Sequence, residues 1–305
     1  MDGLLVVDKP SGLTSHDVVS IIRRLTNEKR VGHTGTLDPA ATGVLLVLVG
    51  RATKISYWLT DEDKTYEGTI ALGAETETLD GEGSVVATAD ASQLTRRDVE
   101  DAAEILKGRH RQEPPAFSAV KIEGRPAYRS ARQGTVVQPP ARSVEVSEFL
   151  VLDFRQGELA EADVRISCSK GTYIRSLARD LGQRLGCGGY LKKLRRTAVG
   201  PFTLARAIAL KEFERALTAG EIADRLISMS EALRNMPQTT VAEAYKDLAL
   251  TGGVLCSEAV SGSQQFAMGT RAIAVVDDND NLIGLYEPLT GDRLKPLRVI
   301  GEGRA

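Results

Sequence analysis

The sequence has few residues of the kinds that build disulfide frameworks or metal sites. Its 305 residues include three cysteines, Cys168, Cys187 and Cys256, and three histidines, and no C-x-x-C pair occurs. An odd number of widely spaced cysteines is not typical of a disulfide framework, and too few histidines accompany them to complete a zinc site. We therefore predict neither disulfides nor a bound metal.

Long apolar runs are also absent. The longest, Val44–Val49, is far shorter than the ~20 residues that a membrane-spanning helix needs. Asp2 and Asp8 do not fit a signal peptide, so we predict a cytoplasmic protein with no membrane partner. A composition of 42% hydrophobic and 26% charged residues is that of a soluble globular protein.

Several enzyme signatures are missing as well. We find no G-x-x-x-x-G-K-[ST] loop, no G-x-S-x-G elbow, no H-E-x-x-H pair and no strand-linked G-x-G-x-x-G. The chain therefore lacks the recognisable machinery of P-loop nucleotide hydrolysis, serine esterase, zinc protease and dinucleotide chemistry.

Charge is nearly balanced but unevenly distributed. The net charge of −2 argues weakly against a nucleic-acid partner, because phosphate binding depends on lysine and arginine. However, residues 61–101 hold twelve acids and three bases, whereas residues 165–200 hold nine bases and one acid. Such segregation can produce a basic face on an acidic protein.

Periodicity predicts an α+β fold with a mixed, largely antiparallel sheet. The run Val44–Val49 has the pattern of a strand buried on both faces, and Thr14 and Asp17 form a capping-box pattern that opens a helix. We predict a further helical stretch from Lys211 to Leu233. The predicted secondary structure then changes to short strands, so we predict a large domain at 1–236 and a small β-rich domain at 237–305.

One carboxylate stands out in a glycine-punctuated loop before the predicted strand Val44–Val49. Asp38 lies within the segment Gly32–Gly43, and Pro39 biases it toward an extended conformation that would present its side chain. A presented carboxylate is a candidate nucleophile. The alternative is an ordinary Asp-Pro turn that precedes a strand.

Two basic features follow later in the chain. Arg175 lies one turn into a predicted helix, where its guanidinium could pair with a carboxylate or phosphate; otherwise it is a solvated helix residue. The second feature is a cluster of four cations, which suits either a phosphate backbone or a plain charged surface: Lys192, Lys193, Arg195 and Arg196.

Tyr66 begins a predicted strand and could stack on a nucleic-acid base, although core packing is the commoner role of a strand tyrosine. His33 could contact a base or be an ordinary loop histidine.

Taken together, these motifs resemble the TruB family, the bacterial tRNA pseudouridine-55 synthases. The resemblance covers about residues 3–205 and rests on five collinear motifs, which are Asp8–Ser15, Gly32–Gly43, Lys64–Tyr66, Pro114–Lys121 and Gly171–Arg175. It implies the pseudouridine synthase fold, a small C-terminal RNA-binding domain of the PUA type, action as a monomer on the T stem-loop of tRNA, and no cofactor.

The resemblance also implies a role for each site residue. Asp38 would be the nucleophile, Arg175 would pair with it, and Tyr66 would stack on the flipped uracil. His33 would fill the space that the base vacates. The remaining lining residues would be Tyr173, Leu194 and Lys54.

Two other functions are compatible with parts of this pattern. A non-catalytic RNA-binding or tRNA-folding protein would keep the scaffold but not need the carboxylate of Asp38. An enzyme that cleaves a free glycoside or nucleoside would usually need two acids at a set separation, and the loop offers one.

Overall fold

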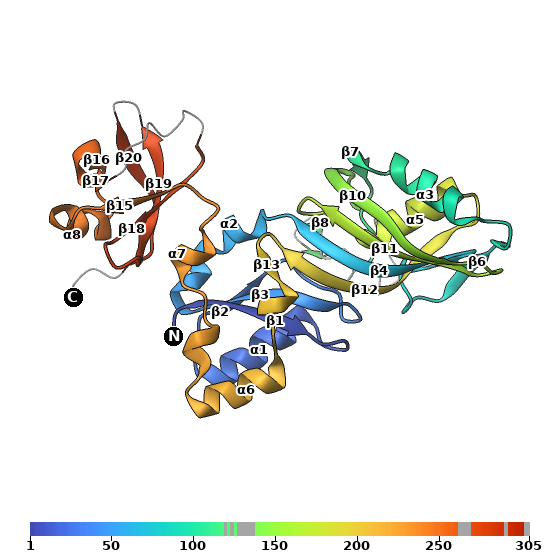
Figure 1. The fold of residues 1–305 in the computed structure, drawn as a ribbon, viewed down its shortest axis with the longest axis horizontal. Coiled ribbons are helices and arrows are strands. Elements are labelled where there is room, and N and C mark those ends of the chain that lie inside the picture. Colours follow the sequence, from blue (N-terminus) through green and yellow to red (C-terminus); the bar gives the residue numbers. More distant parts are fainter. Residues whose placement is uncertain (119–120, 123–124, 127–137, 262–269, 290–291, 302–305) are drawn as a thin grey trace.

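The computed structural model describes residues 1–118, 121–122, 125–126, 138–261, 270–289 and 292–301. They form a ten-stranded sheet and a separate six-stranded sheet (Figure 1). In the large sheet, β1 (Gly3–Lys9) is parallel to β14 (Ile208–Ala209) and β12 (Gly189–Val199) is parallel to β3 (Thr42–Val49), while the other pairings are antiparallel. The predicted α+β class with a mixed, largely antiparallel sheet is confirmed.

The large sheet consists of two parts, and the first half-sheet comprises β14, β1, β3 and β2 (Val31–Thr34). Leu5 and Val7 of β1 face a cluster built with α1 (Ser15–Thr26) and α6 (Leu210–Ala219), whereas Leu4 and Val6 face a second cluster on the opposite side. Strand β3 is likewise buried on both faces, as its continuous apolar run predicts.

The start of α1 follows directly from the sequence. The side chain of Thr14 accepts a hydrogen bond from the Asp17 backbone amide, and the Asp17 carboxylate accepts one from the Thr14 amide. These two bonds satisfy amides that the first helical turn leaves unpaired, so the predicted capping box is confirmed.

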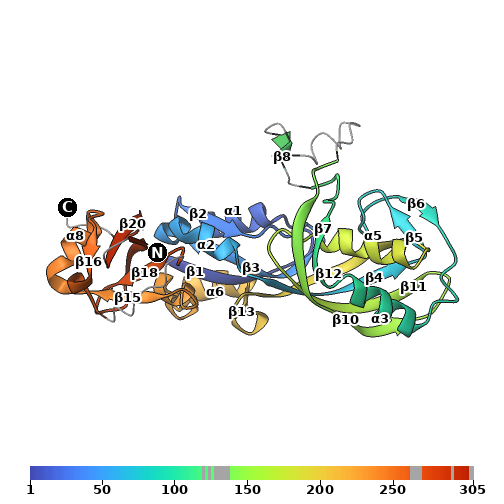
Figure 2. The same ribbon diagram turned by 90° about the horizontal axis from the view of Figure 1, so that it is seen from above.

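The second half-sheet runs in the order β12, β4 (Lys64–Leu72), β11 (Ala160–Cys168), β10 (Arg142–Arg155) and β7 (Gly108–Gln112). One face, the helix face, packs against α3 (Arg96–Ile105) and α5 (Ile174–Arg184) through a shared hydrophobic cluster (Figure 2). The opposite face, the outer face, carries ion pairs between strands, including Glu67 with Arg165 and Asp163 with Arg155.

The two half-sheets meet at a short junction. Among the described residues, the only strand pairing between them is the parallel contact of Thr42 with Arg195 and of Gly43 with Arg196. Gly43 has φ +100°, and a Cβ there would lie 2.1 Å from the carbonyl oxygen of Arg196. Only glycine allows the two strands to approach so closely at this point.

The six-stranded sheet lies at the end of the molecule beside the first half-sheet (Figures 1 and 2). Its order is β16 (Leu255–Cys256), β20 (Arg293–Val299), β19 (Leu282–Leu289), β18 (Ile273–Val276), β15 (Gln238–Val241) and β17 (Val260–Ser261). It supplies the predicted β-rich C-terminal part, while the boundary near residue 236 stays a prediction.

The continuous helical stretch predicted from Lys211 to Leu233 is wrong. Helix α6 ends at Ala219, because Gly220 adopts φ +76° and caps it in the left-handed conformation. A 3₁₀ turn at Ile222–Arg225 and the short α7 (Met229–Ala232) follow. The segment therefore wraps around the first half-sheet instead of forming one rod.

The remaining elements are short. They are α2 (Ser56–Thr60), α8 (Lys246–Leu250), β5 (Ala74–Thr76), β6 (Val85–Thr88), β8 (Lys121–Ile122), β9 (Arg125–Pro126), β13 (Phe202–Thr203) and 3₁₀ turns at Gly50–Ile55, Leu204–Arg206, Glu243–Tyr245 and Ser257–Ala259. No helix in the described ranges is long and apolar enough to cross a membrane. All three cysteines are free thiols.

Candidate active site

Asp38 lies in the loop between β2 and β3, at the junction of the half-sheets. The loop is fixed from behind by the residues around the start of α1. Ser15 Oγ accepts from the Leu37 amide (2.9 Å) and donates to the Leu37 carbonyl (3.1 Å), and the Gly12 amide donates to the Pro39 carbonyl (2.9 Å). The Asp38 side chain remains 45% exposed, so the anchored loop presents it to solvent.

Lys9 adds a third anchor and was missed by the sequence reasoning. Its side chain is fully buried, and Nζ donates to the carbonyls of Leu13 (2.7 Å), Pro10 (2.9 Å) and Pro39 (3.0 Å). Burial lowers the pKa of Lys9 to about 8, and the charge of Asp38 opposes this shift. The available signal was a lysine that follows the apolar run Leu4–Val7 and Asp8 at the end of a strand.

Arg175 is the ion-pair partner of Asp38. Its Nε lies 3.1 Å from Asp38 Oδ2, and its Nη1 lies 3.3 Å from Oδ2 of Asp80. Nη1 and Nη2 also donate to the carbonyls of Thr78 (3.0 Å) and Phe117 (2.9 Å). The Arg175 side chain is only 7% exposed, so this bracing holds the guanidinium in one position against Asp38.

Asp80 is the second site residue that the sequence reasoning missed. Its side chain is 18% exposed and also accepts hydrogen bonds from the Thr78 hydroxyl and the Glu82 amide. It lies in an acidic, turn-rich stretch, in which the sequence gives no reason to single out one carboxylate. The structure shows that this carboxylate shares Arg175 with Asp38.

The first turn of α5 holds Arg175 in place. Tyr173 caps this helix, and its backbone is bracketed by Gln112, whose Nε2 donates to the Tyr173 carbonyl (3.1 Å) and whose Oε1 accepts from the Tyr173 amide (2.8 Å). The guanidinium of Arg142 lies 5.3 Å from the centre of the Tyr173 ring, which is a cation–π distance. Tyr173 is thus held two residues before Arg175, and its place in the pocket lining stays a prediction.

Tyr66 and His33 line the junction below the loop. Tyr66 is 8% exposed and belongs to the same hydrophobic cluster as Leu37. Burial raises the pKa of Tyr66, and Arg196 opposes this shift, whereas both burial and Arg196 lower the pKa of His33. The buried His33 Nδ1 and Thr34 Oγ1 have no hydrogen-bond partner among the described residues, so this region offers polar groups that a ligand could satisfy.

Leu194 lies opposite Gly68 in the pairing of β12 with β4 and packs against the cluster that contains Tyr66. Lys54, by contrast, is not brought to this site. Its Nζ donates to the Val299 carbonyl in the C-terminal sheet (3.2 Å), because the 3₁₀ turn after β3 carries it away from the loop. The expectation that Lys54 lines the pocket is therefore wrong in this structure.

The four cations of β12 do not form one patch. Successive residues of a strand face opposite sides, so Arg196 points to the helix face with Tyr66 while Arg195 points to the outer face with Glu67. Arg196 is 1% exposed, and the prediction that it contacts the RNA backbone is wrong. Lys192 and Lys193 are exposed and stay predicted RNA contacts, although Lys192 pairs with Glu161.

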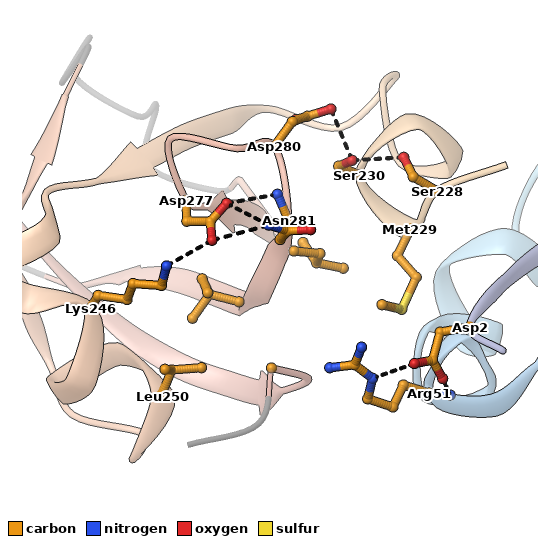
Figure 3. Close-up of a pocket in the computed structure, with 13 residues that line it drawn as sticks. Asp2, Arg51, Ser228, Met229, Ser230, Lys246, Leu250, Asp277, Asp280 and Asn281 are labelled. Carbon is orange, nitrogen blue, oxygen red and sulfur yellow. Dashed lines mark hydrogen bonds and ion pairs between the residues drawn. The ribbon is translucent and has the colours of Figure 1, made fainter. Parts of the chain in front are cut away.

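A cavity of about 280 Å³ lies elsewhere, where the six-stranded sheet meets the first half-sheet (Figure 3). Its polar groups largely satisfy one another. Burial alone would raise the pKa of Asp277, but hydrogen bonds from Lys246 and Asn281 lower it to about 2. Ser230 Oγ donates to Asp280 (3.1 Å), so the cavity marks a joint between the two parts of the protein.

No group of three or more potential metal ligands occurs within the described ranges. An exposed carboxylate braced by a buried arginine, with a buried tyrosine beside it, suits chemistry on a large substrate that brings its reacting group to the loop. The chain superposes on a protein of a Cbf5-Nop10-Gar1 complex with a TM-score of 0.76, at 23% identity, over 98% of this chain and 85% of that one. The two chains therefore share a fold.

Comparison of sequences defines the family. Residues 23–174 match the TruB family pseudouridylate synthase N-terminal domain, and residues 175–236 match the tRNA pseudouridylate synthase B C-terminal domain. The chain is 42% identical to tRNA pseudouridine synthase B of Bacillus anthracis over 98% of this chain and 97% of that protein. It is 47% identical to the enzyme of that name from Corynebacterium efficiens over 90% and 92%. The chain belongs to the TruB family of pseudouridine synthases.

Proposed function

We propose that the protein converts the uridine at position 55 of the tRNA T loop to pseudouridine and that Asp38 is its catalytic nucleophile. The observation that carries this proposal is the pairing of Asp38 with Arg175 at 3.1 Å, in a loop that leaves the carboxylate open to a substrate. The relatives of similar length and matching domains are tRNA pseudouridine synthases by name, which supports tRNA as the substrate.

The reaction explains the residue types. The N1–C1′ bond of uridine breaks, the uracil rotates, a C5–C1′ bond forms, and the proton lost from C5 is balanced by one gained at N1. The atoms balance without a redox partner or an energy source, so no cofactor is required. The target nucleotide must leave its stack to reach the carboxylate, and the detached base must be retained.

Each residue around Asp38 has a role in these reaction steps. Arg175 fixes the direction of the Asp38 carboxylate, because the guanidinium is itself braced by Asp80 and two carbonyls. Tyr66 offers a buried aromatic face and Leu194 an apolar wall for the base. Tyr173 closes the site beside Arg175. His33 stands ready to occupy the space that the flipped base leaves, with an unsatisfied ring nitrogen.

We also propose that the protein acts on the T stem-loop as a monomer, because Asp38, Arg175 and Tyr66 all come from one chain. The six-stranded sheet would serve as the PUA-like RNA-binding domain at 237–305. A hydrogen bond from Ser230 to Asp280, beside the cavity at the joint, links this domain to the large one.

The test is site-resolved mapping of pseudouridine on an unmodified tRNA transcript, by carbodiimide adduct and primer extension. Wild-type protein should give a stop at position 55 and Asp38→Asn should give none, while both bind the transcript alike. If neither protein produced a stop despite tight binding, an RNA-binding or tRNA-folding role would replace catalysis. Turnover of free uridine would point to a nucleoside-cleaving enzyme instead.

A further inference from the structure

Arg196 is the largest fully buried side chain in the described part of the protein, and a role in phosphate binding is not open to it. Its Nε donates to the Val44 carbonyl (2.7 Å) and its Nη2 to the Gly35 carbonyl (2.9 Å). Gly35 begins the catalytic loop and Val44 follows its end. One guanidinium from the second half-sheet therefore holds both ends of the loop that carries Asp38.

The neighbouring arginine makes the matching contact on the other face. Arg195 Nη2 pairs with Asp8 Oδ2 of β1 (2.8 Å), and its Nη1 donates to Thr42 Oγ1 of β3 (3.3 Å). The backbones of Arg195 and Arg196 also form the parallel pairing with Thr42 and Gly43. The two side chains thus reach across the junction on opposite faces of the sheet.

The junction matters because the site is divided across it. Asp38 belongs to the first half-sheet, whereas Tyr66 of β4 and Arg175 of α5 belong to the second. The distance between Asp38 and its partners therefore depends on how the half-sheets are fixed relative to each other. A reacting group displaced by about 1 Å can lose roughly 100-fold in rate without any change in its own chemistry.

We infer that Arg195 and Arg196 form an inter-half clamp that positions Asp38 against Arg175 and Tyr66, with Arg196 as the principal positioning residue. Arg196 touches backbone carbonyls and not the reacting atoms, so it acts through the loop. A lysine at this position would keep the charge but has no planar fork to serve Gly35 and Val44 together. The inference rests on the assignment of Asp38 as the reacting carboxylate.

The test separates positioning from binding and from folding. Arg196→Lys and Arg195→Gln are compared with Arg165→Gln, whose arginine pairs with Glu67 at 2.9 Å and similar exposure, but within the second half-sheet. For each protein the single-turnover rate is followed by tritium release from tRNA carrying [5-³H]uridine, the Kd for tRNA by filter binding, and unfolding by circular dichroism.

We expect Arg196→Lys to lose about 100-fold and Arg195→Gln about tenfold in single-turnover rate, with Kd changed by less than about twofold. Arg165→Gln should keep the wild-type rate. A wild-type rate in Arg196→Lys would overturn the inference, and so would a loss of tRNA affinity that matches the loss of rate.

If Arg196→Lys does not fold, Arg195→Gln decides the question, because its half-exposed side chain can be replaced without leaving a buried cavity. Equal losses of rate in Arg195→Gln and Arg165→Gln would show general destabilisation and overturn the inference. Wild-type and Asp38→Asn proteins in the same assay report separately on the proposed function. An inactive wild-type protein would refute the proposed function. A wild-type rate in the clamp variants would overturn only the clamp and leave the proposed function intact.

Discussion

Asp80 provides a sharp test of how Asp38 is held, because it acts only through Arg175. Replacing it by asparagine keeps the shape and the contacts with Thr78 and Glu82 but removes the charge that lies 3.3 Å from Arg175 Nη1. The Asp80–Arg175 contact is a mostly buried ion pair, and we take its contribution to be about that of a hydrogen bond to a charged group, ~1.5–3 kcal/mol. If this energy keeps the Arg175 guanidinium in its position beside Asp38, Asp80→Asn should slow the chemical step by about 10- to 150-fold.

The assay is the single-turnover rate of tritium release from tRNA, with the Kd for tRNA measured in parallel. The control is Asp163→Asn, since Asp163 also forms an ion pair with an arginine, Arg155 (2.7 Å), but lies on the outer face of the sheet. We expect the control to keep the wild-type rate and both variants to keep the wild-type Kd. A wild-type rate in Asp80→Asn would refute the idea that Asp80 braces the ion pair. Equal losses in the two variants would do the same.

Two further predictions concern the anchors of the loop. The pKa of Lys9 is lowered from 10.5 to about 8 in the folded protein, so between these values the unfolded state binds more protons and wild-type stability should rise with pH. Urea titrations of wild type and Lys9→Met give the unfolding free energy of each protein at a series of pH values. We expect the value for wild type to rise relative to that for Lys9→Met above pH 8. A difference that does not change with pH would contradict this. Gly43→Ala should cost about 3 kcal/mol or more, because its Cβ would meet a carbonyl oxygen at 2.1 Å, whereas Gly220→Ala, with similar positive φ but no atom within 4 Å, should cost about 1 kcal/mol. Equal costs for the two glycines would show that backbone conformation alone decides.

Much of the fold could be predicted because its signals are local. The capping box at Thr14 and the two-sided burial of Val44–Val49 depend on neighbours in sequence, and both are present in the structure. The predicted helix from Lys211 to Leu233 failed at Gly220, where a helical pattern continues across a residue that adopts the left-handed conformation. Periodicity alone does not show where the chain turns to follow the surface beneath it.

The site shows the same limit at the level of single side chains. Arg195 and Arg196 are identical neighbours in sequence, yet one is half-exposed on the outer face and the other is fully buried. What separates them is the register of β12 against β4, which places Arg196 opposite Tyr66. Register is set by contacts between segments about 130 residues apart, so no pattern within the four-cation cluster could reveal it.

Lys9, Asp80 and Arg196 share a property that explains why the sequence did not reveal their roles. Each acts on Asp38 through something else: Lys9 through the Pro39 carbonyl, Asp80 through Arg175, and Arg196 through the Gly35 carbonyl. A motif identifies candidate residues that contact the substrate, whereas the residues that position those side chains are recognised only from their contacts in the structure. Because the proposed nucleophile Asp38 and its counterion Arg175 stand on separate half-sheets, we expect such indirect contacts to decide whether a correctly folded chain is also an active one.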